Sequence, residues 1–415
     1  MKILWLSHLI PYPPKAGVIH RSYNLIKQLS QAHDIHILAF NQEALIANMY
    51  DDIETGTREA IEQLEAVCDE IVIVDLPQKS YFGGKYALAL KSLVNRLPYS
   101  VLWLQSSEYR VALAELMQKT SFDIIHFDTI SLSQYHSDVK SIPCVLNHHN
   151  VESHLLLRRA TRCRNIFEKA FLSFEGRKLQ YFEELVYSDF ELHLFCSELD
   201  ERRMKSFCHG MRSAIVPNGV DMSNCDVAQQ QFDQRLLFLG TLDWEPNRRA
   251  VDFIVLEIWP LIRERCPDVV FDLVGANPPR SAIRLSMSDS RFRVHGFVDN
   301  VEPFFNSGGI FVCPITDGGG TKLKLLDALA MGMPTIAHPI ACEGLDVVPE
   351  RDLLTATSAE EFANTIERLL FDSKLRAKLS KSGEILVKSK YDYKLIGEHL
   401  SGRYMSIAAN AEMTG

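Results

Sequence analysis

The sequence predicts an α/β protein built from two doubly wound, Rossmann-like domains that face a central cleft. Short apolar runs rich in β-branched residues alternate with longer amphipathic segments, and this alternation occurs twice along the chain. The apolar runs contain few polar residues, as is typical of parallel strands that are covered on both faces. The chain has 415 residues, whereas a single core usually stops growing at about 250–300 residues.

Each half of the chain contains its own series of strands and helices. The strands expected in the first half are Lys2–Ser7, Asp34–Ala39, Glu70–Val74, Ile124–Phe127, Cys144–Asn147 and Glu191–Cys196. The helices expected there are Val18–Gln31, Arg58–Val67 and one long stretch from about Val151 to Tyr187. The second half has strands at Arg235–Leu239, Val269–Val274, Phe292–His295, Ile310–Pro314 and Thr335–Ala337, with helices at Arg249–Arg265 and Leu323–Met331.

A polar, turn-rich segment separates the two series. Val216–Asp221 has the composition of a turn, and Ser223–Gln234 is polar. We therefore expect a first domain over 1–213 and a second over 214–390. A helical segment over 391–415 follows, and one possible arrangement is that it crosses back to the first domain.

Composition narrows the class of protein. A net charge of −9, with 47% hydrophobic and 23% charged residues, is typical of a soluble globular protein and argues against one that coats nucleic acid. Nine scattered cysteines without a CxxC pair indicate a reducing compartment without disulfides or a zinc cluster. Neither a signal peptide nor an apolar run long enough to span a membrane is evident, so we expect a cytoplasmic protein.

Two candidate sites lie at predicted strand ends in the first half. Pro11–Val18 leads into a helix whose N–H groups can receive an anion, and Gly17 would allow close approach of the backbone. A GxGxxG motif is absent, and a simple turn is an equal alternative.

The second candidate site is Asn147–Glu152. His148 and His149 alternate in side-chain direction, so at most one faces a site, where it can donate a hydrogen bond. Asn150 is a candidate helix cap, the histidines can alternatively be structural, and the spacing disfavours a metal site.

The third candidate site, Asp317–Gly332, contains the most residues that could bind a charged ligand. Three glycines, Gly318 to Gly320, precede a helix and form an anion cradle at its N-terminus. Thr321 can cap this helix and donate to a phosphate, and Lys322 and Lys324 add positive charge. Asp327 lies about two turns into the helix, where a carboxylate can accept both hydroxyls of a ribose. The spacing differs from that of a Walker A loop.

Several motifs, in order, resemble the family 4 retaining glycosyltransferases of the GT-B fold. The resemblance rests on Gly17 with Arg21, Asn147–Ser153, Val216–Asp221, Leu239–Asn247, His295–Asp299 and Gly319–Ala328. The Gly-Gly-Thr-Lys-x-Lys form resembles a subgroup that acts in bacterial polysaccharide and cell-envelope assembly.

The resemblance implies roles for individual residues. The second domain would hold a nucleotide-sugar donor and the first would face an acceptor. Asp327 would bind the ribose, while Gly319 stands where the family has a glutamate. The usual Arg/Lys pair has no clear match after Gly240, so Arg248 or Arg249 would replace it, or the lysines would supply the charge. The implied donor-binding residues are Gly17, Gly240, Gly319, Gly320, Thr321, Leu323 and Asp327. The implied catalytic residues are His149, Lys322, Lys324 and Arg248.

The resulting expectation is a metal-independent hexosyltransferase without a cofactor. It would move a sugar from a nucleoside diphosphate to a hydroxyl of a glycan, lipid-linked or small-molecule acceptor, with retention of configuration. The alternatives are a nucleotide-sugar epimerase of the same fold and a non-catalytic nucleotide-sugar-binding partner protein. The base, the sugar, the acceptor and the oligomeric state stay open.

Two basic and apolar segments raise a separate question about membranes. Ser153–Lys178 and Lys79–Arg96 both combine positive charge with large apolar side chains. This combination suits peripheral contact with anionic lipid on the inner face of the cell membrane. The alternative is a helix packed on the core with a solvated basic face.

Overall fold

The computed structural model describes residues 1–15, 17–47, 50, 52–77, 84–224, 232–306, 308–317 and 320–414. The chain divides into two compact units, Met1–Pro217 with Ile396–Gly415 (unit 1) and Asn218–Leu395 (unit 2). The change of unit falls after Pro217, and not after residue 213 as expected, because Ser213–Ile215 forms an edge strand of unit 1.

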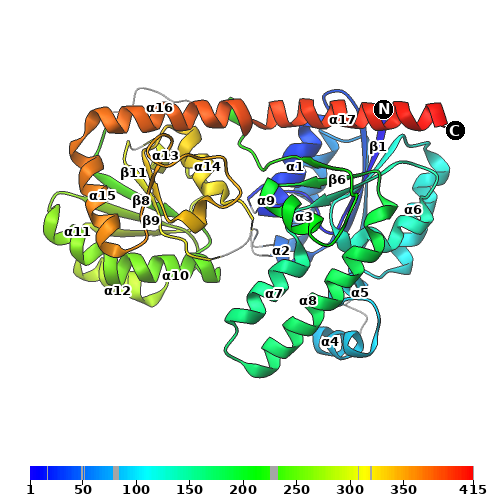
Figure 1. Cartoon of the computed structure of the whole chain (residues 1–415), viewed down its shortest axis with the longest axis horizontal. Helices are drawn as coiled ribbons and strands as arrows, with labels where there is room; N and C mark the ends of the chain where they lie inside the picture. Colours follow the sequence, from blue (N-terminus) through cyan, green and yellow to red (C-terminus); the bar gives the residue numbers. More distant parts are fainter. Residues whose placement is uncertain are drawn as a thin grey trace. The chain divides into compact units, whose positions relative to one another are not determined.

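Unit 1 is built on a seven-stranded parallel sheet in the order β3-β2-β1-β4-β5-β6-β7. Figure 1 shows two of its strands, β1 and β6, among the helices of unit 1. The strands are β1 (Lys2–Ser7), β2 (Asp34–Asn41), β3 (Glu70–Asp75), β4 (Ile124–Phe127), β5 (Cys144–His148), β6 (Leu192–Phe195) and β7 (Ser213–Ile215). The helices are α1 (Gly17–Leu29), α2 (Glu43–Ile46), α3 (Ile53–Glu65), α4 (Gly84–Val94), α5 (Tyr99–Trp103), α6 (Ser107–Lys119), α7 (Glu152–Arg162), α8 (Ile166–Val186) and α9 (Glu198–Lys205).

Both faces of this sheet are buried, which explains why its strands are almost entirely apolar. On one face Leu4 and Leu6 join a core cluster with Leu113 of α6. On the other face Trp5 stacks on His126, which contacts the C-terminal helix α17 (Tyr393–Thr414). From Ile396 onward α17 belongs to unit 1.

The helix expected from Val151 to Tyr187 is in fact two antiparallel helices, α7 and α8. The chain breaks at Cys163–Asn165 because the Asn165 side chain accepts hydrogen bonds from the N–H groups of Phe167 and Glu168. It thereby starts a new helix. A Cβ on Gly176 would lie 2.9 Å from the Leu157 side chain, so this glycine lets the two helices pack closely.

Unit 2 has a six-stranded parallel sheet in the order β10-β9-β8-β11-β12-β13. The strands are β8 (Arg235–Leu239), β9 (Val270–Val274), β10 (Phe292–Gly296), β11 (Ile310–Cys313), β12 (Thr335–Ala337) and β13 (Leu354–Thr355). The helices are α10 (Glu245–Phe253), α11 (Trp259–Arg265), α12 (Arg280–Ser288), α13 (Glu302–Phe305), α14 (Leu323–Ala330), α15 (Ala359–Phe371) and α16 (Ser373–Lys390). A π-helical turn, Ile254–Ile258, joins α10 to α11.

The two sheets share one pattern, in which the first strand of each lies beside the fourth and the order reverses between them. The predicted fold class, two doubly wound α/β units, is therefore confirmed. Among the helices of the described ranges, none has the length and apolar character needed to cross a membrane.

Candidate functional site

The point where the strand order reverses is where doubly wound sheets bind ligands, at the carboxyl ends of the strands. In unit 1 this point lies between β1 and β4, and in unit 2 between β8 and β11. Leu6 pairs with Phe127, and Phe127 pairs with Leu146. The residues that follow these three strands therefore emerge at the same edge of the sheet.

A buried carboxylate, Asp128, lies at this edge of unit 1. It follows β4 directly and is 0% exposed. Its Oδ2 accepts a hydrogen bond from Ser22 Oγ at 2.8 Å, and its Oδ1 accepts one from Asn147 Nδ2 at 3.1 Å. His149 Nε2 lies 3.2 Å from Oδ1. Burial alone would raise the pKa of Asp128, but the nearby histidines, His149 above all, hold it well below its ordinary value.

A buried arginine extends this network. Arg21, on α1, donates from Nη2 to Asn147 Oδ1 and from Nη1 to the carbonyl oxygen of Pro217, both at 3.0 Å. Asn147 therefore connects the guanidinium group to Asp128. Arg21 is 0% exposed to solvent. Its guanidinium group is therefore held inside the protein, where it can orient the network.

Two further histidines surround Asp128. His8 follows β1, and its Nδ1 lies 3.9 Å from Asp128 Oδ2. Burial lowers the pKa of His8 to about 4, against the opposing attraction of Asp128. His126 stacks on Trp5 with ring centroids 3.5 Å apart, and its Nδ1 lies 2.5 Å from the Tyr404 hydroxyl. The C-terminal helix thus reaches the network through Tyr404.

The paired histidines separate as their alternation predicts. His148 is buried, stacks on Phe195 at 4.6 Å and lies 3.0 Å from His193, so its role is structural. Of these two histidines, His149 is the one that contacts Asp128. The prediction that Asn150 caps the next helix is wrong, because Val151 is the N-cap and makes no side-chain cap bond.

Gly17 is the first residue of α1 and is exposed. No described atom lies within 4 Å of the position that a Cβ would take there. Within the described part of unit 1, a Cβ would therefore fit at this position.

In unit 2, Lys324 lies at the end of β8. Gly240 follows β8 with φ 153°, and a Cβ on it would overlap Lys324 Nζ. Lys324 Nζ donates to Asn247 Oδ1 at 2.8 Å, and Asn247 Nδ2 donates to the carbonyl oxygen of Thr241 at 2.8 Å. Nζ also lies 4.7 Å from the centroid of the Phe238 ring. Burial lowers the pKa of Lys324 to about 8.

The loop before α14 is held by its own polar contacts. Lys322 Nζ donates to the carbonyl oxygen of Gly320 at 2.9 Å, and Thr321 Oγ1 accepts from Asn218 Nδ2 at 2.5 Å. Gly320 has φ 65°, a left-handed conformation that favours glycine. The prediction that Thr321 caps α14 is wrong, because Lys322 is the N-cap and makes no side-chain cap bond. Gly319 lies outside the described residues.

Helix α14 begins at Leu323 and carries Asp327 one turn beyond Lys324. Asp327 is partly buried, and this burial raises its pKa to about 7, although the nearby Lys324 opposes the shift. A cation with a lowered pKa and a carboxyl with a raised pKa therefore lie on the same helix. Perturbed pairs of this kind are frequent at functional sites.

The two arginines of α10 differ in their contacts. Arg249 Nε donates to Glu245 at 2.8 Å, and its Nη1 lies 3.9 Å from Asp317. Arg248 is exposed. Of the two, Arg249 is therefore engaged by carboxylates of its own unit.

Sequence reasoning missed Asp128, His8 and Asn247. His8 and Asp128 are polar residues immediately after an apolar strand, which is the only signal they give. Asn247 ends the Leu239–Asn247 motif but was given no role there, because its role comes from its contact with Lys324.

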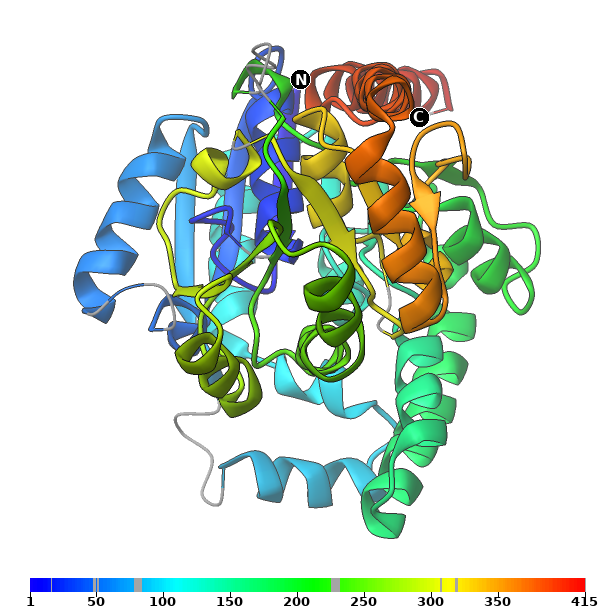
Figure 2. The same cartoon turned by 90° about the vertical axis from the view of Figure 1, so that its left-hand side faces the viewer.

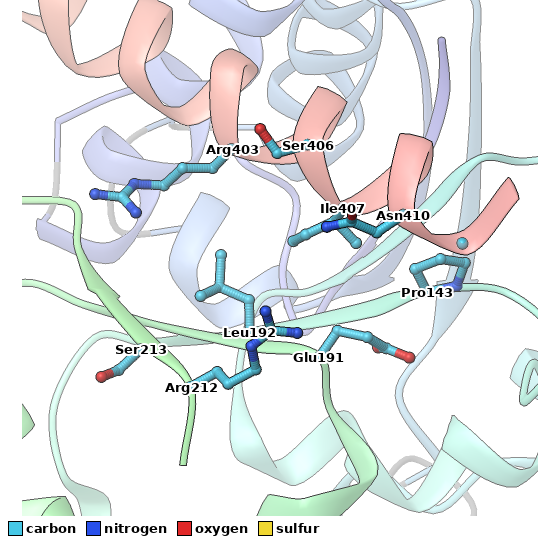
Figure 3. A pocket seen from close by; sticks show the side chains of 10 residues that line it. Pro143, Glu191, Leu192, Arg212, Ser213, Arg403, Ser406, Ile407 and Asn410 are labelled. Carbon is cyan, nitrogen blue, oxygen red and sulfur yellow. The ribbon is translucent and has the colours of Figure 1, made fainter. Parts of the chain in front are cut away.

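A separate groove of about 630 Å³ lies in unit 1 beneath α17 (Figure 3). It is lined by Pro143, Glu191 and Arg212, which precede β5, β6 and β7, and by Arg403 and Ile407 of α17. It therefore lies at the amino ends of the strands, away from Asp128. Among the described residues, no group of three or more histidines, cysteines or carboxylates is placed to hold a metal ion.

Comparisons with known proteins agree with this architecture. The chain is similar over 98–99% of its length to two solved structures with low sequence identity. Sucrose-phosphate synthase from Thermosynechococcus elongatus matches with a TM-score of 0.68 at 15% identity, over 99% of this chain and 100% of that one. HepE from Anabaena, in complex with UDP, matches with a TM-score of 0.65 at 14% identity, over 98% of this chain and 100% of that one. HepE is also described in complex with UDP-glucose. The architecture is that of the GT-B fold.

Sequence comparison assigns a family to part of unit 2. Residues 233–372 match the family described as "Glycosyl transferases group 1". The chain is also 21% identical over 378 residues to an uncharacterized 44.6 kDa protein in the cps region of Klebsiella pneumoniae. This alignment covers 88% of this chain and 90% of that protein. The protein therefore has a GT-B fold, and a segment of unit 2 matches the group 1 glycosyltransferase family.

Proposed function

We propose that this protein is a cytoplasmic glycosyltransferase that moves a sugar from a nucleoside diphosphate to a hydroxyl group in polysaccharide synthesis. The acceptor is a glycan, a lipid-linked sugar or a small molecule. The observation that carries the proposal is Lys324, a partly buried cation beside the strand-end residue Gly240 within the group 1 domain. Its pKa, lowered by burial, indicates a charge that the protein does not fully compensate.

A departing diphosphate would supply the missing negative charge. As the bond to the sugar breaks, negative charge develops on the diphosphate, and a fixed cation stabilises that state more than the ground state. Lys324 would contribute this cation, with Lys322 and the N–H groups at the start of α14 beside it. With this charge supplied by the chain, the proposed reaction needs no divalent metal.

The remaining roles follow the same reasoning. Asp327 would accept the ribose hydroxyls, and His149 would hydrogen-bond the transferred sugar. Asp128 would orient the His149 ring, since its Oδ1 lies 3.2 Å from Nε2. Retention of anomeric configuration and the hexosyl class of the sugar are proposed on the resemblance to family 4 enzymes.

Two relatives support the biological setting. One belongs to a cps region, which is consistent with work in capsule polysaccharide synthesis. The other binds UDP and UDP-glucose, so UDP-sugars are the first donors to test.

The test is a thermal-shift screen of UDP-, GDP- and ADP-sugars, followed by transfer assays with the donor that binds. A donor at about 100 times its Kd adds about 2.7 kcal/mol of stability. NMR of the glycoside product would read the anomeric configuration. Free nucleotide and an altered sugar without acceptor would instead identify an epimerase. Donor binding without turnover on any acceptor would identify a binding protein, and no binding at all would reject the proposal.

A further inference from the structure

Helices α7 and α8 form a hairpin that extends from unit 1, with α4 close to it (Figure 2). Contacts fix α4 and the segment after it against α8. Lys178 Nζ donates to the carbonyl oxygen of Ser92 at 2.6 Å, and the Tyr99 N–H donates to Glu175 Oε2 at 2.7 Å. With the close packing at Gly176, these contacts make α4, α7 and α8 one connected surface.

Large apolar side chains are unusually exposed on this surface. Among the described residues, nine of the nineteen exposed large hydrophobic side chains lie on α4 and α8. The end of the hairpin, which we call the hairpin tip (Arg162–Lys169), carries Ile166 at 73% and Phe167 at 83% exposure. On α4, Leu90 is 68% and Val94 is 89% exposed. Single exposed apolar residues are ordinary, whereas a gathered set marks an interaction surface.

The same segments are strongly basic in an acidic protein. Ser153–Lys178 carries a net charge of +5, and residues 76–107 carry four basic and no acidic residues, while the whole chain carries −9. Arg164 and Lys169 flank the two apolar residues of the hairpin tip, and both are exposed. The remainder of the chain therefore carries a net negative charge, whereas both of these segments are net positive.

Apolar side chains surrounded by basic ones are complementary to one kind of partner. A bilayer with anionic head groups accepts apolar side chains at its acyl boundary and attracts lysine and arginine at its surface. We propose that the hairpin tip and α4 dock this protein onto an anionic lipid bilayer, as presented by the cytoplasmic face of a cell membrane.

The test is co-sedimentation of the full-length protein with vesicles of phosphatidylcholine alone or mixed with phosphatidylglycerol. At low salt we expect about tenfold stronger partitioning onto the anionic vesicles, and we expect high salt to reduce it. The double variant Phe167→Ser/Lys169→Glu removes one apolar and one basic contact and should lower partitioning at least about tenfold.

The matched control is Phe371→Ser/Lys374→Glu, which changes an equally exposed pair where α15 meets α16. It should partition like the wild type, and thermal unfolding should show that both variants are folded. Wild-type protein that stays in solution at low salt, or equal loss in both variants, would overturn the proposal. So would a wild-type dimer that only the Phe167 variant dissociates, with no lipid binding, because the surface would then join two copies. The assay contains no donor, so its result is independent of the proposed transferase activity.

Discussion

The two units share one strand order but carry opposite charges at the point where that order reverses. In unit 1 the residue after the fourth strand is Asp128, a wholly buried anion. In unit 2 the corresponding edge holds Lys324, a partly buried cation. The same backbone arrangement therefore supports two different kinds of chemistry.

The difference lies in how well each charge is compensated. Asp128 receives hydrogen bonds from Ser22 and Asn147 and lies close to His149, and its pKa falls. Within the described residues, Lys324 donates its hydrogen bond to the neutral oxygen of Asn247, and burial lowers its pKa to about 8. A compensated buried charge organises its surroundings, whereas a poorly compensated one can gain most from a ligand of opposite charge.

The largest expected effect comes from removing the cation. Lys324→Met should lower kcat/KM by about 10²–10³, as the loss of one preorganised electrostatic contact does. In the wild type, kcat/KM should fall as pH rises through about 8, because Lys324 then loses its proton. Steady-state kinetics from pH 6 to pH 9 would measure both effects.

Exposed Lys374 offers a matched control, since Lys374→Met removes the same charge elsewhere in unit 2. The desolvation relieved in Lys324→Met offsets its lost hydrogen bond, so both variants should unfold within a few degrees of the wild type. If Lys324→Met kept full activity, the proposed donor site would be wrong.

The second largest effect is expected at Asp128, the buried carboxylate whose charge is compensated. Asp128→Asn should cost about 2–3 kcal/mol of unfolding free energy, because it removes hydrogen bonds to a charged group. It should also lower kcat by about tenfold or more through a misoriented His149. Exposed Asp346, paired with Lys390 at the surface, provides the control variant Asp346→Asn.

The pH dependence of the unfolding free energy tests whether Asp128 stabilises the protein through its negative charge. Its folded pKa lies below the unfolded value of about 3.9, so its stabilisation is present above that pH and is lost as pH falls further. Urea unfolding should therefore show a constant difference between wild type and Asp128→Asn from pH 7 to about pH 4, and convergence below. A difference that grew on acidification would contradict the assigned charge state.

The sequence predicts the elements of both units better than it predicts their sites. Apolar runs gave β1 and β8 with their observed bounds, whereas β7 and β13 were missed because three and two residues carry no usable pattern. The break between α7 and α8 depends on a single capping residue, Asn165, inside a continuous helical pattern.

The candidate site residues differ in a similar way in how far the sequence marks them. Lys324 and His149 belong to motifs, so their spacing marked them. Asp128 is a single polar residue, and its importance comes from the register that places β1, β4 and β5 side by side. No local spacing carries that information.

A smaller effect is expected at the carboxyl group beside Lys324. Asp327 has a pKa raised to about 7 and accepts hydrogen bonds from ribose fully only when ionised. Donor affinity in the wild type should therefore increase as pH rises through about 7. Asp327→Asn should weaken donor binding by about tenfold and remove that dependence. Calorimetric titration of the donor at pH 6 and at about pH 7.5, where Lys324 is still mostly protonated, tests this. An unchanged pH dependence in the variant would exclude Asp327 as the titrating group.

The smallest effect distinguishes the two arginines of α10. Arg249 is engaged by Glu245 and Asp317, whereas Arg248 is exposed and carries the proposed auxiliary charge for the donor. Arg248→Ala should lower kcat/KM by about threefold to fivefold at low salt, and Arg249→Ala by less than about twofold. Since both side chains are exposed, high salt should abolish the difference. Wild-type kcat/KM in both variants at low salt would mean that neither arginine assists, and would leave Lys322 and Lys324 to supply the positive charge that compensates the diphosphate.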